Sequence, residues 1–155
     1  MNFSGISDKS PIGKLLRLPL RLIPPGAKVP VLQGRLRGKT WIVEASIHGC
    51  WLGSFEYDKR RVMEKLVKEG SVVFDLGAHV GFYTLLASVL VGPRGQVFAF
   101  EPVSRNLFFL KEHLRLNRVA NVTVMEVAVS DRSGEVAFDE GQGNSMGHIA
   151  LSGQM

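Results

Sequence analysis

The stretch that most constrains the fold is residues 72–83, where an apolar run leads into an acid, two glycines four positions apart and a second apolar segment. The first run predicts a strand buried on both faces of a parallel sheet, because strands covered by helices on both sides are apolar almost throughout. Residues 82–91 are apolar over the length of a helix. A strand, a glycine turn and a helix in this order direct backbone N–H groups and a helix N-terminus at a ligand.

The glycine spacing separates two kinds of cofactor. A dinucleotide fingerprint needs glycine at its third and sixth positions, so that the backbone can approach a pyrophosphate and the helix can pack on the strand. Counted from Gly77, these positions hold His79 and Phe82, which are both bulky. The remaining pattern has an acid at Asp75 and glycines at 77 and 81. By itself, it is explained equally well by a turn that only joins a strand to a helix.

A second strand adds specificity to this pattern. Residues 95–102 form a turn, a β-prone apolar run and an acid, Glu101, which lies 20 residues after Gly81. In doubly wound folds an acid about 20 residues beyond the glycine loop accepts hydrogen bonds from a ribose diol. Glu101 alone is explained more simply as a solvated residue at a strand end. Strand, glycine turn, helix, strand and acid within one unit are more specific than either part.

Several segments together resemble the FkbM family of methyltransferases. They are 75–84 (Asp-Leu-Gly-Ala-His-Val-Gly-Phe-Tyr-Thr), 98–102 (Phe-Ala-Phe-Glu-Pro), Asn106, 128–131 (Ala-Val-Ser-Asp) with Gly134, and the upstream 51–56 (Trp-Leu-Gly-Ser-Phe-Glu). The resemblance extends from about residue 31 to residue 138. One departure is His79, where the family usually carries asparagine.

The resemblance implies a Rossmann-like fold with S-adenosylmethionine as cofactor. It implies methyl transfer to a hydroxyl of a small molecule or glycan, such as a sugar or a secondary metabolite. The implied cofactor contacts are the loop residues, the ribose acid and two residues at the end of the third strand that would face the adenine ring. These are Asp75, Gly77, Ala78, His79, Gly81, Phe82, Glu101, Ala128 and Val129. No catalytic residue or general base can be assigned.

The expected fold class is α/β, the N-terminal β-α-β-α-β half of a doubly wound sheet. A hairpin at 29–43 and a helix capped by Asp58 and stopped by Gly70 precede it. A later helix should begin at Ser104 and end at Asn117, with Asn106 and His113 on its surface and Asn106 supporting the turn. A third strand should span 121–129, and a short strand 135–138. Residues 1–28 form an expected basic arm, 29–155 a methyltransferase domain and 71–138 its cofactor core.

The residues after 138 are rich in glycine and contain too few apolar residues for the remaining strands of such a sheet. The Asp-x-Glu-Gly segment that the family carries after its fourth strand is absent. We therefore expect an incomplete methyltransferase with weak or no activity alone. One alternative is a non-catalytic cofactor-binding or interaction domain, completed by another chain or by self-association along the open sheet edge. A nucleotide-binding oxidoreductase half-domain is a third, which His79 and Phe82 oppose.

The charge of the chain is concentrated at one end. Residues 1–40 hold eight Lys/Arg and one acid, and Phe3 is their only aromatic residue. Nucleic-acid binding, which combines basic with aromatic side chains, is therefore not expected. Residues 14–23 are basic and leucine-rich, which permits weak contact with a membrane surface, although a solvated arm is the preferred interpretation. The single cysteine, Cys50, and the lack of a signal peptide or long apolar run predict a cytoplasmic protein, and the histidine spacing predicts no metal.

Overall fold

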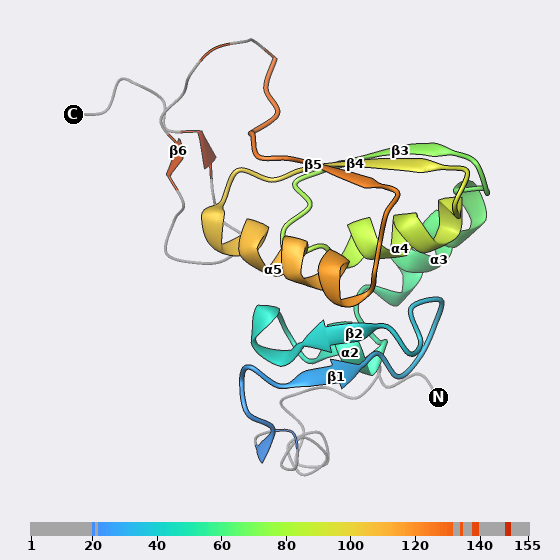
Figure 1. Cartoon of the computed structure of the whole chain (residues 1–155), viewed down its shortest axis with the longest axis vertical. Coiled ribbons are helices and arrows are strands. Elements are labelled where there is room, and N and C mark those ends of the chain that lie inside the picture. The colour runs from blue at the N-terminus through green and yellow to red at the C-terminus, as the bar shows by residue number, and fades with distance from the viewer. Residues whose placement is uncertain (1–19, 21, 132–133, 135–137, 140–147, 150–155) are drawn as a thin grey trace. The chain divides into compact units, whose positions relative to one another are not determined.

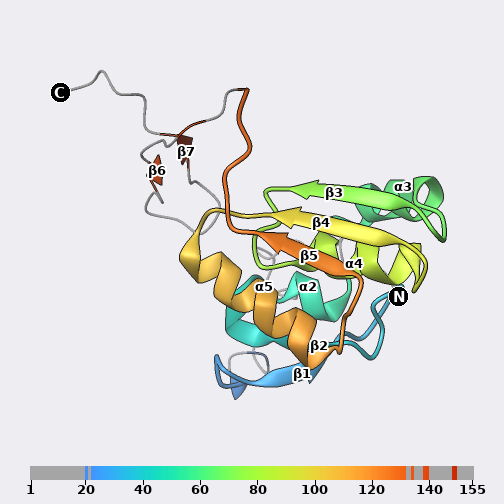
Figure 2. The same cartoon turned by 45° about the horizontal axis from the view of Figure 1, so that its top comes forward.

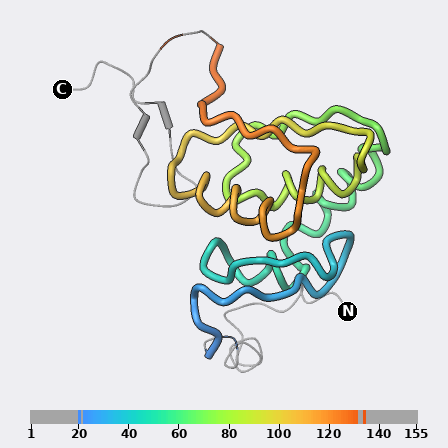
Figure 3. The backbone as a smooth tube through the Cα atoms, in the orientation of Figure 1, coloured from blue at the N-terminus to red at the C-terminus, as the bar shows by residue number. Residues whose placement is uncertain are grey.

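The computed structural model describes residues 20, 22–131, 134, 138–139 and 148–149. The chain divides into two compact units, Met1–Lys68 and Glu69–Met155, here called the N-terminal and C-terminal units. Each is described separately. Figure 3 traces the backbone, with the first hairpin in blue and the third strand of the parallel sheet in orange. Residues 1–19 of the expected basic arm lie outside the described part of the chain.

The N-terminal unit contains the expected hairpin. Strands β1 (Lys28–Pro30) and β2 (Thr40–Ile42) pair antiparallel, with Val29 opposite Trp41. The short helices η3 (Val43–Ala45) and α2 (Gly49–Leu52) follow, and then α3 (Tyr57–Leu66). The core of this unit consists of buried apolar residues from the hairpin, η3 and α2, which include Val31, Leu36, Trp41, Val43, Cys50 and Trp51.

Helix α3 differs from its prediction. It begins after Glu56, which has a φ of 40°, so Asp58 lies in the first turn and does not cap the helix. Val62 and Leu66 are 56% and 73% exposed, whereas the buried residue of the helix is Arg60. Val62 and Leu66 therefore do not belong to a buried apolar face of α3.

The C-terminal unit is an α/β sheet of the expected topology (Figures 1 and 2). Strands β3 (Val72–Leu76), β4 (Gln96–Phe100) and β5 (Val122–Met125) are parallel and lie in the order β3-β4-β5. Helices α4 (Phe82–Val91) and α5 (Ser104–Leu116) connect them. This confirms the β-α-β-α-β half of a doubly wound, Rossmann-like sheet. Val103 precedes α5 as its N-cap, one residue before the predicted position.

Both connecting helices cover the same face of the sheet (Figure 1). On that face, Ala78 and Ala99 pack with Leu107, Leu110 and Leu114 of α5. This arrangement contradicts the prediction that the first strand is buried on both faces. Along β3, residues 72, 74 and 76 are exposed and residues 73 and 75 are partly buried. The apolar run predicted burial on both faces of β3. In the C-terminal unit, the described helices α4 and α5 cover only one of them.

The third strand is shorter than predicted. It ends at Met125, and Val127 and Val129 beyond it are 49% and 50% exposed. Of the short strand expected at 135–138, residues 135–137 lie outside the described residues, and β6 (Phe138–Asp139) pairs antiparallel with β7 (His148–Ile149). No helix among the described residues has the length and hydropathy needed to span a membrane.

Candidate functional site

The glycine loop after β3 folds back onto the end of β4. The N–H groups of Gly77 and Ala78 both donate to the carbonyl oxygen of Phe100, at 2.9 Å each. Gly77 has a φ of 79°, and a Cβ added there would meet no atom within 4 Å. Its requirement for glycine is therefore conformational, since only glycine adopts a positive φ without strain. A methyl group at position 77 would therefore contact no neighbouring atom.

Glu101 joins this loop to the start of α5. The residue is 4% exposed, and its carboxylate accepts hydrogen bonds from His79 N (2.7 Å), Val103 N (3.0 Å) and Asn106 Nδ2 (3.2 Å). The interpretation of Glu101 as a solvated strand-end residue is therefore wrong. A carboxylate has about four lone-pair positions, so these contacts leave about one for a ligand. A contact from Glu101 to a ribose remains a prediction, and it is limited to about one hydrogen bond while this network is intact.

Asp75 lies at the end of β3, next to the same loop. Thr84 Oγ1 donates a hydrogen bond to its Oδ2 at 2.5 Å. Burial raises the pKa of Asp75, the hydrogen bond from Thr84 opposes this, and the charge of Glu101 raises the pKa further. The loop is therefore bordered by two carboxylates that repel one another.

The backbone N–H groups of the loop are largely used within the protein. Those of residues 77, 78 and 79 are bound as described above, and Gly81 N donates to Ala78 O at 2.9 Å. The expectation that the loop directs its N–H groups at a ligand is thus wrong for these four residues. A loop with bound N–H groups and two neighbouring carboxylates is a poor site for a pyrophosphate and a suitable one for a cationic ligand.

Helix α5 fixes the far side of the loop. A Cβ added to Gly81, whose φ is 88°, would lie 2.6 Å from Leu110 Cδ1. His113 is fully buried, and its Nδ1 lies 2.8 Å from the carbonyl oxygen of Val80. Because a carbonyl only accepts, His113 Nδ1 carries the proton. Burial lowers the pKa of His113 to about 4, so the ring is neutral at neutral pH.

The predictions that placed Asn106 and His113 on the surface are wrong. Asn106 is 2% exposed and supports the turn through Glu101, the role expected for it. His113 was assigned to the surface because charged residues flank it. It lies three positions after Leu110 and one before Leu114, and this helical spacing is the signal that marks the inner face of α5.

Three further residues were predicted to contact the cofactor: Phe82, Ala128 and Val129. Phe82 is buried at the start of α4, where its ring meets the edge of Tyr83. Ala128 is partly buried and Val129 is half exposed, both beyond the end of β5. Their contact with an adenine ring remains a prediction. The described residues include no group of three side chains suited to hold a metal ion.

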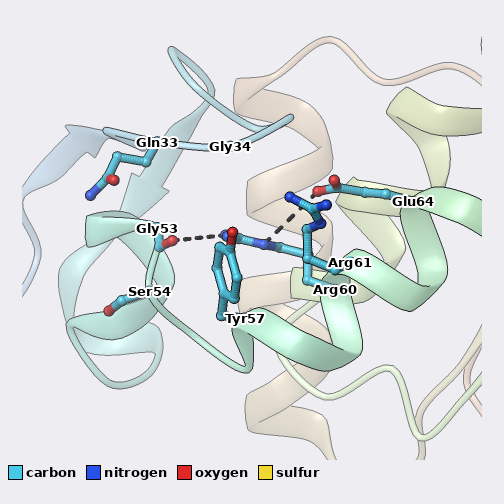
Figure 4. A pocket seen from close by; sticks show the side chains of 8 residues that line it. All are labelled: Gln33, Gly34, Gly53, Ser54, Tyr57, Arg60, Arg61 and Glu64. Atoms are coloured by element: carbon cyan, nitrogen blue, oxygen red, sulfur yellow. Dashed lines mark hydrogen bonds and ion pairs between the residues drawn. The ribbon is translucent and has the colours of Figure 1, made fainter. Parts of the chain in front are cut away.

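The N-terminal unit contains a separate cavity of about 260 Å³ (Figure 4), which the sequence did not indicate. Arg60 is 5% exposed there, and its Nη1 donates to Gly53 O at 2.9 Å. Its guanidinium also lies 5.5 Å from the centre of the Tyr57 ring and 3.9 Å from Glu64. Arg60 therefore ties α3 to the preceding loop. The residues lining the cavity are Gln33, Gly34, Gly53, Ser54, Tyr57, Arg60, Arg61 and Glu64.

No family model matches this chain, and no curated protein matches it. Solved structures do. An S-adenosylmethionine-dependent methyltransferase from Aquifex aeolicus is 29% identical over 44% of this chain and 37% of its own, with a TM-score of 0.41. A precorrin-6y C5,15-methyltransferase from Geobacter metallireducens is 28% identical over 47% and 39%, with a TM-score of 0.43. Fibrillarin from Aeropyrum pernix, solved with natively bound S-adenosylmethionine, is 25% identical over 46% and 32%, with a TM-score of 0.39. This chain thus spans less than two fifths of each protein.

Proposed function

We propose that the C-terminal unit binds S-adenosylmethionine and that the chain is a methyltransferase of the S-adenosylmethionine-dependent class. The observation that carries this proposal is the pair of carboxylates, Asp75 and Glu101, beside a loop whose N–H groups at four positions are bound internally. This cofactor carries a sulfonium and an ammonium group and no pyrophosphate. The same two carboxylates oppose a nicotinamide dinucleotide, because its pyrophosphate would face two acids.

The residues fit the cofactor at three points. No atom lies within 4 Å of a Cβ placed at Gly77, so a ligand atom can be accommodated beside the loop there. Asp75 supplies a partly buried carboxylate for a cationic group, and Glu101 retains about one lone-pair position for a hydroxyl. His79, Ala78, Phe82, Ala128 and Val129 are assigned to the same site by the resemblance to the FkbM family.

When bound, S-adenosylmethionine supplies a methyl group that can pass to a nucleophilic oxygen. We propose a hydroxyl of a sugar or secondary metabolite as the acceptor, which rests on the same resemblance. Asp75 and Glu101 are proposed to hold the cofactor, and no other described residue is assigned to take the acceptor's proton. We therefore propose weak or no methyl transfer by this chain alone, and labelled methyl transfer to a panel of hydroxyl acceptors would contradict it.

Cofactor binding is tested by calorimetric titration and thermal melting of the whole chain. A ligand specific for the folded state adds about 2.7 kcal/mol of stability at 100 times its dissociation constant. We expect S-adenosylmethionine to raise the melting midpoint and NAD to leave it unchanged. Asp75→Asn should weaken S-adenosylmethionine binding about tenfold or more, because a charge-assisted contact is lost. Glu112→Gln, a change to a carboxylate paired with Arg115 on α5, is the matched control.

The unliganded Asp75→Asn variant provides a second readout. A raised pKa means that the folded protein disfavours the ionised carboxylate, so this charge lowers stability at neutral pH. The substitution removes the charge, and the carbonyl oxygen of the new amide can still accept the hydrogen bond from Thr84. We expect the unliganded variant to melt at a higher temperature than the wild type. A variant that is both more stable and unaltered in cofactor affinity would contradict the proposed role of Asp75.

A non-catalytic interaction domain is the second candidate. The exposed apolar face of β3 favours it, because large exposed apolar patches mark interaction sites. A cooperative melt that S-adenosylmethionine does not shift would support this candidate over the first.

A further inference from the structure

The cavity of the N-terminal unit is lined by three segments of the chain. As Figure 4 shows, they are the loop between β1 and β2, the segment between α2 and α3, and helix α3 itself. Every residue that lines the cavity belongs to the N-terminal unit. The volume of about 260 Å³ is slightly below the roughly 300–1,000 Å³ of pockets for drug-sized ligands. The cavity therefore suits a smaller molecule.

Arg60 brings a buried positive charge to this cavity. The residue is 5% exposed, and its Nη1 donates to the carbonyl oxygen of Gly53 at 2.9 Å. Its Nε is buried without a hydrogen-bond partner among the described residues, since Glu64 Oε1 lies 3.9 Å away. The ring of Tyr57, 5.5 Å from the guanidinium carbon, adds a cation–π contact. A guanidinium has five N–H donors, and a buried charge is costly unless it is well paired. The protein therefore compensates the charge of Arg60 only in part.

The charges of the lining favour a ligand with one negative charge. Arg60 and Arg61 are positive and Glu64 is negative, which leaves a net charge of +1. One carboxylate balances this charge, and its two oxygens match the planar fork of an arginine. A phosphate carries more than one negative charge at neutral pH and would be repelled by Glu64. The remaining polar side chains of the lining are one amide and two hydroxyl groups, which can bond hydroxyl groups of a ligand.

We propose that this cavity binds a small hydroxy acid, whose carboxylate pairs with the guanidinium of Arg60. The site belongs to the N-terminal unit, so the proposal does not rest on the cofactor site proposed for the C-terminal unit. Arg60 connects α3 to the segment before it. A carboxylate bound to Arg60 should therefore stabilise the folded N-terminal unit.

The first test is calorimetric titration of the whole chain with L-lactate and D-glycerate at neutral pH, without S-adenosylmethionine. We expect one site per chain and a raised melting midpoint in tryptophan fluorescence, because both tryptophans are buried in this unit. Glycerol, which has no carboxylate, should give neither effect. Inorganic phosphate should bind about tenfold more weakly or less. No binding of either acid, or phosphate binding as tight as theirs, would overturn the proposal.

The second test uses two substitutions in the lining that should change lactate affinity in opposite directions. Glu64→Gln removes a carboxylate that repels the ligand and should tighten binding about threefold. Arg60→Lys keeps the charge but removes the planar fork, so it should weaken binding about tenfold. Arg94→Gln is the matched control, because Arg94 is an exposed arginine that pairs with Glu69 in the C-terminal unit. It should leave the affinity unchanged.

The two substitutions separate ligand binding from a purely structural role of Arg60. If Arg60 only connects α3 to the preceding segment, Glu64→Gln will change the lactate affinity no more than Arg94→Gln does, and the proposal is overturned. Far-ultraviolet circular dichroism checks that Arg60→Lys is folded. If it is not, Glu64→Gln decides alone, since no hydrogen bond joins Glu64 to Arg60 at 3.9 Å.

Discussion

His113 and Glu101 determine the shape of the glycine loop through hydrogen bonds to its backbone. Glu101 accepts from His79 N, and His113 donates to Val80 O, so two consecutive residues of the loop are held by two buried side chains. Removing either side chain is expected to destabilise the loop, because its partner would remain as a buried polar group without a hydrogen bond. The chemistry of the loop therefore depends on residues that need not touch a ligand.

The buried His113 makes stability depend on pH. Its pKa is about 4 in the folded protein and 6.5 in the reference state, so below pH 6.5 the unfolded chain binds the additional proton. Its contribution is fully present above pH 6.5 and is lost as the pH falls to about 4. The loss amounts to about 3 kcal/mol at most.

Urea unfolding of wild type and His113→Asn at several pH values measures this effect. We expect the variant to be about 1–2 kcal/mol less stable at pH 7, because a buried hydrogen bond is disturbed. Its free energy of unfolding should fall less than that of the wild type between pH 6.5 and 4. Equal slopes for the two proteins would contradict a buried neutral histidine.

The sequence predicted some of these residues and missed others for physical reasons. The turn at Gly77 and Gly81 was predictable because a positive φ requires glycine at those positions of the sequence itself. The burial of His113 was missed because its charged neighbours in sequence lie on another face of the helix. The internal use of the loop N–H groups depends on Phe100 and Glu101, more than 20 residues away.

At the scale of elements, α5 and the glycine loop fit closely at one point. Gly81 approaches Leu110 so closely that a methyl group at 81 would overlap it, whereas a methyl group at Gly77 would enter open space. Both glycines have a positive φ, so both positions carry conformational strain in any other residue. Only Gly81 adds a packing requirement.

Alanine substitutions should separate these two costs. Gly77→Ala should lower the free energy of unfolding by about 1–2 kcal/mol through backbone strain alone. Gly81→Ala should cost about 1–3 kcal/mol more, because overpacking is added. In chemical denaturation, Gly81→Ala combined with Leu110→Ala should cost less than the sum of the two single changes. Additive losses would show that the contact with Leu110 is not the reason for glycine at 81.

The elements themselves were largely predictable. Helix α4 was predicted from the apolar run at 82–91, and β4 from the β-prone run before Glu101. Both predictions were possible because the length and composition of a run are local properties of the sequence. The exposure of β3 was not predictable, since an apolar strand has the same sequence whether or not a layer covers it. The chain beyond Met125 was predicted as strand because Val127 and Val129 continue the alternation, yet both are exposed there.

At the scale of the whole chain, the described residues form two compact units with separate cores. The two tryptophans of the chain, Trp41 and Trp51, are both buried in the N-terminal unit. The proposed cofactor site lies wholly in the C-terminal unit. Tryptophan fluorescence therefore reports on the N-terminal unit, whereas circular dichroism reports on the helices and strands of both units.

We expect saturating S-adenosylmethionine to shift the thermal transition followed by circular dichroism more than the one followed by tryptophan fluorescence. Ligand binding stabilises the unit that contains the site, and tryptophan emission follows the other unit. Melting the chain with both probes, with and without the ligand, measures the difference. Identical shifts in the two signals would show that the units unfold as one.

The packing of α5 against the glycine loop also has an evolutionary consequence. The motif consists of residues 75–81, but its conformation also depends on contacts with Leu110 and His113 of α5. A lineage could therefore keep every letter of the motif and still lose cofactor affinity through changes in α5. Conversely, a loop transplanted into another scaffold would need both partners from α5 to keep its conformation. Sequence comparisons and loop grafts should therefore include the residue pairs 81–110 and 80–113 as well as the motif itself.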